Sequence, residues 1–213
     1  MLRQAKLALL QLADAVGINH LFLRSSWRKQ RLLILCYHSS SIEDEYLWSP
    51  YLHMAPELMR QRFQALKEAN MNVLPLGEAV EKLRKGTLPE RSVAITFDDG
   101  TYDFYKISWP ILKTFGFPVT VYYTTYYANF SRPVFDGTLS YLAWKSKVSV
   151  INWPEIFSGP LPVQQACLEV LKFAKSNGFT GEEKDALLGV WAGKLGFDLR
   201  SLLREADYFH HEA

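Results

Sequence analysis

The chain has 213 residues, of which 48% are hydrophobic and 22% charged, and 24 Lys and Arg residues against 22 Asp and Glu give a formal net charge of +2. These values are typical of a globular protein with a sizeable core, and they exclude an intrinsically disordered chain. A charge balance this even gives no sign of a nucleic-acid partner, which would require a strong basic excess.

The amino-terminal segment, residues 1–31, is predicted to be an amphipathic helix followed by a lead-in. The helix covers Met1–Val16, with Arg3 and Lys6 on its polar side. Its apolar stretch, Leu7–Leu12, is too short for a transmembrane helix or for the apolar region of a secretory signal peptide. We therefore expect a cytoplasmic protein. Packing of the helix on the domain is the preferred interpretation, and a membrane-peripheral helix is the alternative.

The next hundred residues alternate between strand and helix patterns. Strands are predicted at Leu32–Tyr37, Val73–Leu74, Val93–Phe97 and Val119–Thr125. Helices are predicted between them, beginning at Pro56, Leu76 and Pro110, with Gly86 and Gly116 ending the second and third. This alternation predicts parallel strands in an α/β fold, with functional groups at the carboxyl ends of the strands.

Two features of the predicted core depend on composition. The first strand is uniformly apolar, which predicts a strand buried on both faces. The two cysteines, Cys36 and Cys167, lie in apolar patterns without metal or redox spacing, so both are expected to be small buried hydrophobic residues.

From residue 138 onward the alternation stops. Consecutive helices are predicted at Pro162–Ser176, Glu182–Leu195 and Asp198–Ala206. We interpret residues 138–213 as a helical insertion and chain end, after an α/β part that covers residues 32–137.

The strongest candidate site is Thr96-Phe97-Asp98-Asp99-Gly100, at the end of a predicted strand. Two adjacent carboxylates cannot both ionise cheaply without a nearby cation. One carboxylate can bind a divalent metal while the other accepts a proton from a metal-bound water. A simple Asp-Gly turn explains the same residues equally well.

This motif resembles the first motif of the polysaccharide deacetylase family, the NodB-homology domain. Leu35-Cys36-Tyr37-His38 is similar to the Tyr-His that ends the family's first strand, and Asp103–Val121 is similar to the helix and strand after the motif. Arg132–Asp136 is similar to a subgroup of the family, and the resemblance covers Leu32–Phe197.

The resemblance implies a distorted (β/α) barrel, of which this chain would form a part. It also implies an enzyme that removes N-acetyl groups from amino-sugar polymers or glycolipid-linked sugars. It implies that Asp98 is the general base and Asp99 a ligand of a divalent metal, with zinc as the expected ion. The remaining ligands in the family come from a later His-Ser/Thr-x-x-His motif. His38 shares the expected site and is a candidate for substrate binding, although a structural histidine would explain it equally well.

The sequence departs from the family pattern in its histidines. None of the five has His-x-x-x-His spacing, and the adjacent pair His210-His211 lies at the chain end. Because side chains of adjacent residues point apart and chain ends fray, we do not expect this pair to replace the missing ligands. The resemblance implies that the second motif begins beyond Ala213, so we expect a truncated chain that holds the metal poorly.

A non-catalytic remnant that binds carbohydrate or a partner protein is the alternative to a deacetylase, and a partner chain that completes the barrel is expected because an unclosed barrel exposes strand edges. A phosphotransferase or phosphatase is disfavoured, because such sites use Asp-x-Asp, whose alternate residues project to one side, whereas Asp98 and Asp99 are adjacent.

Overall fold

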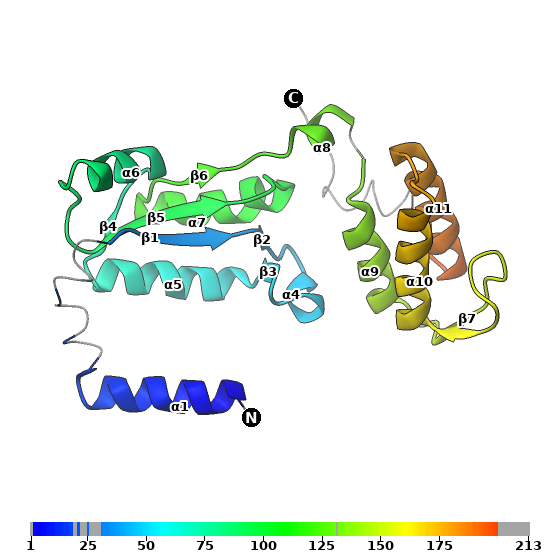
Figure 1. The fold of residues 1–213 in the computed structure, drawn as a ribbon, viewed down its shortest axis with the longest axis horizontal. Helices are drawn as coiled ribbons and strands as arrows, with labels where there is room; N and C mark the ends of the chain where they lie inside the picture. The colour runs from blue at the N-terminus through cyan, green and yellow to red at the C-terminus, as the bar shows by residue number, and fades with distance from the viewer. Residues whose placement is uncertain (1, 19–20, 22–24, 26–30, 131, 200–213) are drawn as a thin grey trace.

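The computed structural model describes residues 2–18, 21, 25, 31–130 and 132–199 (Figure 1). The amino-terminal helix is α1 (Leu2–Ala15). The sheet and its surroundings comprise β1 (Leu33–Tyr37), β2 (Ser39–Ser40), α4 (Glu45–Trp48), β3 (His53–Met54), α5 (Pro56–Glu68), β4 (Asn72–Val73), α6 (Leu76–Arg84), β5 (Ser92–Phe97), the π-helical turn η1 (Phe104–Ser108), α7 (Trp109–Phe115), β6 (Thr120–Val121) and α8 (Thr125–Phe130). The remainder comprises α9 (Phe135–Lys145), β7 (Val150–Ile151), β8 (Leu161–Pro162), α10 (Val163–Ser176) and α11 (Gly181–Lys194).

The main sheet is parallel and β5 is its centre. Strand β1 pairs with β5 along its whole length, from Leu33 beside Val93 to Tyr37 beside Phe97. On the opposite edge of β5, β4 pairs with its beginning and β6 with its end. The predicted α/β class with parallel strands is confirmed. In the described residues the sheet is open, and β1 lies next to β5 although β4 comes between them in the chain.

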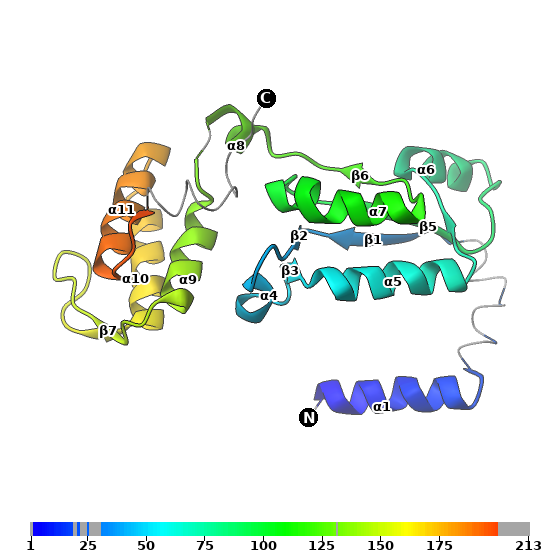
Figure 2. The ribbon, with the colours of Figure 1, turned by 180° about the vertical axis from the view of Figure 1, so that it is seen from behind.

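One face of this sheet is covered by α5 and α7, which lie side by side along it in both views (Figures 1 and 2). Helix α5 begins at Pro56, as predicted, and α7 ends at the left-handed Gly116. The buried core consists of Tyr37, Met59, Phe63, Val93, Ile95, Phe97, Ile111 and Leu112. In this core Met59 and Phe63 of α5 lie four positions apart, and Val93, Ile95 and Phe97 of β5 lie at every second position. Helix α5 and strand β5 therefore each present one apolar face to the core.

The other face of β1 is not covered, and the prediction of a strand buried on both faces is wrong. Alternate residues Leu35 and Tyr37 contact the core, whereas Ile34 is 49% exposed and Cys36 is also exposed. The apolar composition of β1 predicted burial, but burial requires a second layer. Within the described part of the chain, no such layer covers this face of β1.

The helices α9, α10 and α11 pack around a core of their own (Figures 1 and 2). Trp191 is fully buried there, and its indole N–H donates to the backbone carbonyl of Leu139 at 3.0 Å. Both α10 and α11 agree with the predicted helices to within a residue or two, whereas most of the predicted third helix, Asp198–Ala206, lies outside the described residues. The sequence did not indicate β8, which pairs antiparallel with β7.

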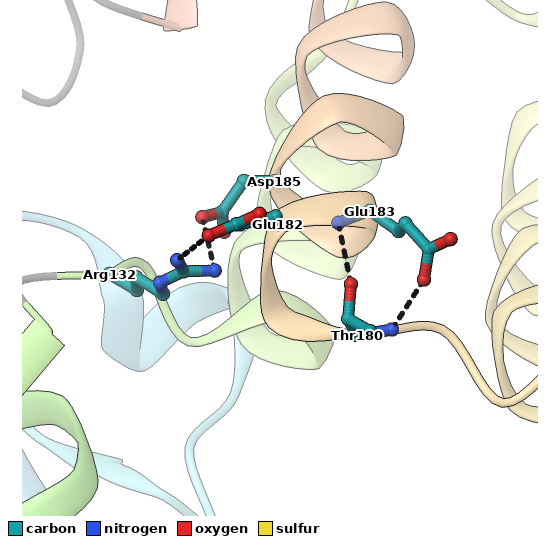
Figure 3. Close-up of polar contacts among 5 residues, drawn as sticks. All are labelled: Arg132, Thr180, Glu182, Glu183 and Asp185. Atoms are coloured by element: carbon teal, nitrogen blue, oxygen red, sulfur yellow. Dashed lines mark hydrogen bonds and ion pairs between the residues drawn. The ribbon is translucent and has the colours of Figure 1, made fainter.

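The start of α11 is fixed by polar contacts (Figure 3). Thr180 and Glu183 form a capping box, in which each side chain accepts a hydrogen bond from the other residue's backbone N–H. Arg132, in the connection before α9, forms ion pairs with Glu182 at 3.3 Å and Asp185 at 3.2 Å. These contacts attach the connection between α8 and α9 to the first two turns of α11.

A second set of contacts joins α4 to α9. The Asp44 carboxylate, just before α4, pairs with the ammonium of Lys145 and accepts a hydrogen bond from the Tyr141 hydroxyl at 3.3 Å. The rings of Trp48 and Tyr141 meet edge to face at 5.4 Å. The loop that follows β2 is thereby held against the first of the three helices.

Helix α1 forms as predicted. The preferred interpretation, in which this helix packs on the domain, is wrong for its apolar residues. Leu9, Leu12 and Val16 remain 66%, 60% and 60% exposed. Among the helices of the described segments, none is both long and apolar enough to cross a bilayer.

Candidate functional site

The carboxyl ends of β1 and β5 bring the predicted site residues together. His38 directly follows β1, and Asp98 and Asp99 directly follow β5. The backbone N–H of Asp98 donates to the carbonyl of Tyr37 at 2.9 Å, so the parallel pairing continues to the site. The Nε2 atom of His38 lies 3.9 Å from Oδ2 of Asp98, with the two side chains 43% and 39% exposed. The prediction that these residues share one end of adjacent strands is confirmed.

The turn after β5 depends on two left-handed residues, Asp99 at φ 70° and Gly100 at φ 64°. The Gly100 N–H donates to the Asp98 carbonyl at 2.9 Å, and the Thr124 N–H donates to the Asp99 carbonyl at 3.3 Å. A Cβ at position 100 would lie 2.2 Å from Cδ2 of Tyr123. Only glycine therefore fits, and the tight turn leaves Asp99 exposed to solvent.

Sequence reasoning missed Cys36 as a neighbour of the site. Its thiol donates to Oδ2 of Asp98 at 3.4 Å. Partial burial, together with the Asp98 and Asp99 carboxylates, raises the pKa of this thiol against an opposing hydrogen bond with Thr96. The prediction of a buried hydrophobic residue holds for Cys167 and is wrong for Cys36. Strand periodicity could have placed Cys36 near the site, because Cys36 lies two residues before His38 and extended chain projects such residues to the same side.

A buried carboxyl group, Asp103, was also missed. It accepts a hydrogen bond from the backbone N–H of Ser40 at 2.5 Å, next to a Ser40–Ser108 hydroxyl contact of 2.6 Å. Desolvation raises the pKa of Asp103 from 3.8 to about 6, against hydrogen bonds with Thr101 and Ser40. These contacts join β2, which begins just after His38, to the start and end of η1, which follows the Asp98-Asp99 turn.

The Asp103 carboxyl should make stability depend on pH. Its folded pKa lies above its unfolded value, so the unfolded chain releases this proton first and the unfolding free energy falls as pH rises from about 4 to about 6. Relative to Asp103→Asn, which has no such proton, the wild type should lose up to roughly 3 kcal/mol between these limits. Urea unfolding of both proteins across this range measures the difference, and parallel curves would show that burial does not control this group.

The site as described does not complete a metal centre. Among residues 2–18, 21, 25, 31–130 and 132–199, no three His, Cys, Asp or Glu side chains are placed to hold one ion. Structural and catalytic zinc sites use three or four protein ligands. The donors near Asp98 therefore do not fit a divalent metal by themselves. His210 and His211, which were considered as replacements for the missing metal ligands, lie outside the described residues.

Comparison with known proteins confirms the family resemblance over part of the chain. Residues 85–137, which include the Asp98-Asp99 turn, match the family model described as Polysaccharide deacetylase. Over 93 residues the chain is 30% identical to the poly-beta-1,6-N-acetyl-D-glucosamine N-deacetylase of Escherichia coli K12, covering 43% of this chain and 14% of that protein. A protein of the same name from Staphylococcus epidermidis is 35% identical over 66 residues, which span 31% of this chain and 23% of that protein.

Two solved structures also show partial similarity. The deacetylase PplD of Streptococcus pyogenes in complex with acetate is 32% identical, with a TM-score of 0.39 over 42% of this chain and 41% of the other. IcaB from Ammonifex degensii is 26% identical, with a TM-score of 0.36 over 42% of this chain and 37% of the other.

Proposed function

We propose that this chain, whose residues 85–137 match the polysaccharide deacetylase family, supplies part of the active site of a hydrolase that removes N-acetyl groups from amino sugars. The observation that carries the proposal is the position of Asp98 and Asp99 at the carboxyl end of the central strand, beside His38 on the neighbouring strand. Active sites of parallel α/β folds lie at this end of the strands.

Asp98 is proposed as the general base. Its carboxylate is 39% exposed, so an attacking water can reach it, and it already accepts a hydrogen bond from the Cys36 thiol. A base must lie within hydrogen-bond reach of the proton that it takes. His38, 3.9 Å from the same carboxylate, is proposed to orient it or to bind the sugar.

Asp99 is proposed as a ligand of a divalent ion, zinc by family resemblance. Asp99 lies in a turn with a left-handed backbone and is exposed, so an ion from solvent can reach its carboxylate. When bound, such an ion would polarise the acetamide carbonyl and activate water. The other ligands would have to come from residues beyond the described ones or from a partner chain.

The open sheet is proposed to be part of a distorted (β/α) barrel. The uncovered face of β1, with Ile34 at 49% exposure, would then face the barrel interior. Further strands from a longer chain or a partner would pair with the edge of β1 that no strand of the described residues occupies, and would bury this face. Residues 138–213, which include the separately packed α9, α10 and α11, are proposed to be a helical insertion.

The substrate class is proposed from the relatives. Two of them are named for poly-beta-1,6-N-acetyl-D-glucosamine. A polymer of N-acetylated amino sugars is therefore the first substrate to test, and a glycolipid-linked amino sugar is the second.

A second candidate function is carbohydrate or partner binding without turnover. It is favoured by one observation: the described segments contain no set of three metal donors. Binding of N-acetylglucosamine oligomers by this chain, with no acetate release from any lengthened form, would support this function over the first.

Acetate release tests the proposed hydrolase directly. A chain lengthened by a relative's segment that carries His-Ser/Thr-x-x-His should, with zinc, deacetylate β-1,6-linked N-acetylglucosamine oligomers. Asp98→Asn should reduce the rate by roughly 100-fold or more, because the amide cannot accept the proton from water. Equal rates of acetate release for the lengthened chain and its Asp98→Asn variant would show that Asp98 is not the general base.

A further inference from the structure

Helix α1 presents an apolar stripe that the rest of the described chain does not cover. Ala5, Leu9, Leu12 and Val16 recur at the spacing of one helical face, and all four are exposed. The contrast with α5 is sharp, because Met59 and Phe63, also four residues apart, are completely buried. In Figures 1 and 2, α1 lies apart from α5 and from the sheet. An amphipathic helix gains most of its stability by burying its apolar face. We therefore expect a binding partner to cover this face of α1.

Charge identifies the occupant. Residues 1–31 contain six Lys and Arg residues and one acidic residue, Asp14, which gives this segment a net charge of +5. The remaining 182 residues contain 18 basic and 21 acidic residues, a net charge of −3. The near-neutral total therefore hides a strongly basic amino-terminal segment. Pairing of α1 with α1 of a second copy would bring two such segments together, and like-charge repulsion disfavours it.

We propose that α1 is an interfacial helix that binds an anionic phospholipid membrane through Leu9, Leu12 and Val16, with Lys6 at the headgroups and the net positive charge of residues 1–31 drawing the segment to the anionic surface. An apolar stripe beside basic residues is typical of helices that lie in the plane of a membrane surface. At 14 residues, α1 is too short to span the bilayer and long enough to lie on it. This function is independent of the proposed deacetylase site, which lies at the carboxyl ends of β1 and β5 and contains no residue of α1.

Vesicle sedimentation of the 213-residue chain tests the proposal. The chain should sediment with vesicles of phosphatidylcholine that contain about one third phosphatidylglycerol, and much less with pure phosphatidylcholine. Leu9→Gln combined with Leu12→Gln should lower the partition coefficient about tenfold or more. Lys6→Glu should lower it roughly fivefold while leaving the apolar stripe intact, and added salt should weaken binding of the wild type.

Leu168→Gln is the matched control, because Leu168 is 64% exposed on α10, a helix of the same length as α1. It should bind vesicles like the wild type. The proposal is overturned if the wild type ignores anionic vesicles, or if the double variant binds as tightly as the wild type. It is also overturned if light scattering shows self-association that the double variant abolishes, because α1 would then bind a second copy.

Discussion

The 213-residue chain should release no measurable acetate from N-acetylglucosamine oligomers, even with zinc added in excess. The described residues place Asp98, Asp99 and His38 at one strand end but provide no group of three metal donors. One or two exposed donors compete poorly with water for a divalent ion, and a loosely held ion neither activates water nor fixes the carbonyl.

Acetate release is followed with a coupled enzyme assay, and the lengthened chain described above serves as the active control. Robust turnover by the 213-residue chain that Asp99→Ala abolishes would contradict this account. It would mean that ligands must be sought among His38, His210 and His211.

Gly100→Ala should destabilise the protein by about 2–5 kcal/mol, the largest loss expected from any glycine in the described chain. Two effects add at this position. The left-handed backbone at φ 64° costs an alanine about 1–2 kcal/mol, and a Cβ 2.2 Å from the Tyr123 ring adds roughly 1–3 kcal/mol of overpacking.

Two other glycines separate these effects. Gly116 has the same left-handed backbone at φ 65° but nothing within 4 Å of a Cβ, so Gly116→Ala should cost only the backbone part, about 1–2 kcal/mol. Gly77 lies in α6 with an open surrounding, and Gly77→Ala should be neutral or stabilising by up to about 1 kcal/mol. Urea unfolding measures the series.

A double variant isolates the ring contact. In a Tyr123→Ala background, the cost of Gly100→Ala should fall to that of Gly116→Ala, because the overpacking has gone. Equal costs for Gly100→Ala and Gly116→Ala in the wild-type background would show that Tyr123 moves aside freely, and that the turn is not held by this contact.

The elements that could be predicted from the sequence are those specified by neighbouring residues. Pro56 starts α5, Gly116 ends α7, and α11 begins at a capping box that needs only Thr180 and Glu183. The site location followed from a local pattern too, because a strand that ends in Asp98-Asp99 places both residues at one edge of any parallel sheet.

The features that could not be predicted depend on distant residues. The exposure of Ile34 and Cys36 depends on whether a second layer covers β1, which an apolar strand cannot reveal. From sequence alone an aspartate such as Asp103 is expected at the surface. Its burial depends on the packing of β2 beside the helical turn η1. The short strand β8 was missed because its two residues form a ladder only with β7.

The assignment of separate roles to Asp98 and Asp99 is tested most directly by measuring zinc affinity and acetate release together in the lengthened chain. Asp98→Asn should keep zinc affinity within about threefold of the parent while losing turnover, because it removes a base and not a ligand. Asp99→Ala should lose both, since loss of a ligand weakens binding by about 10-fold or more. The account is contradicted if Asp98→Asn loses zinc while Asp99→Ala retains both zinc and turnover.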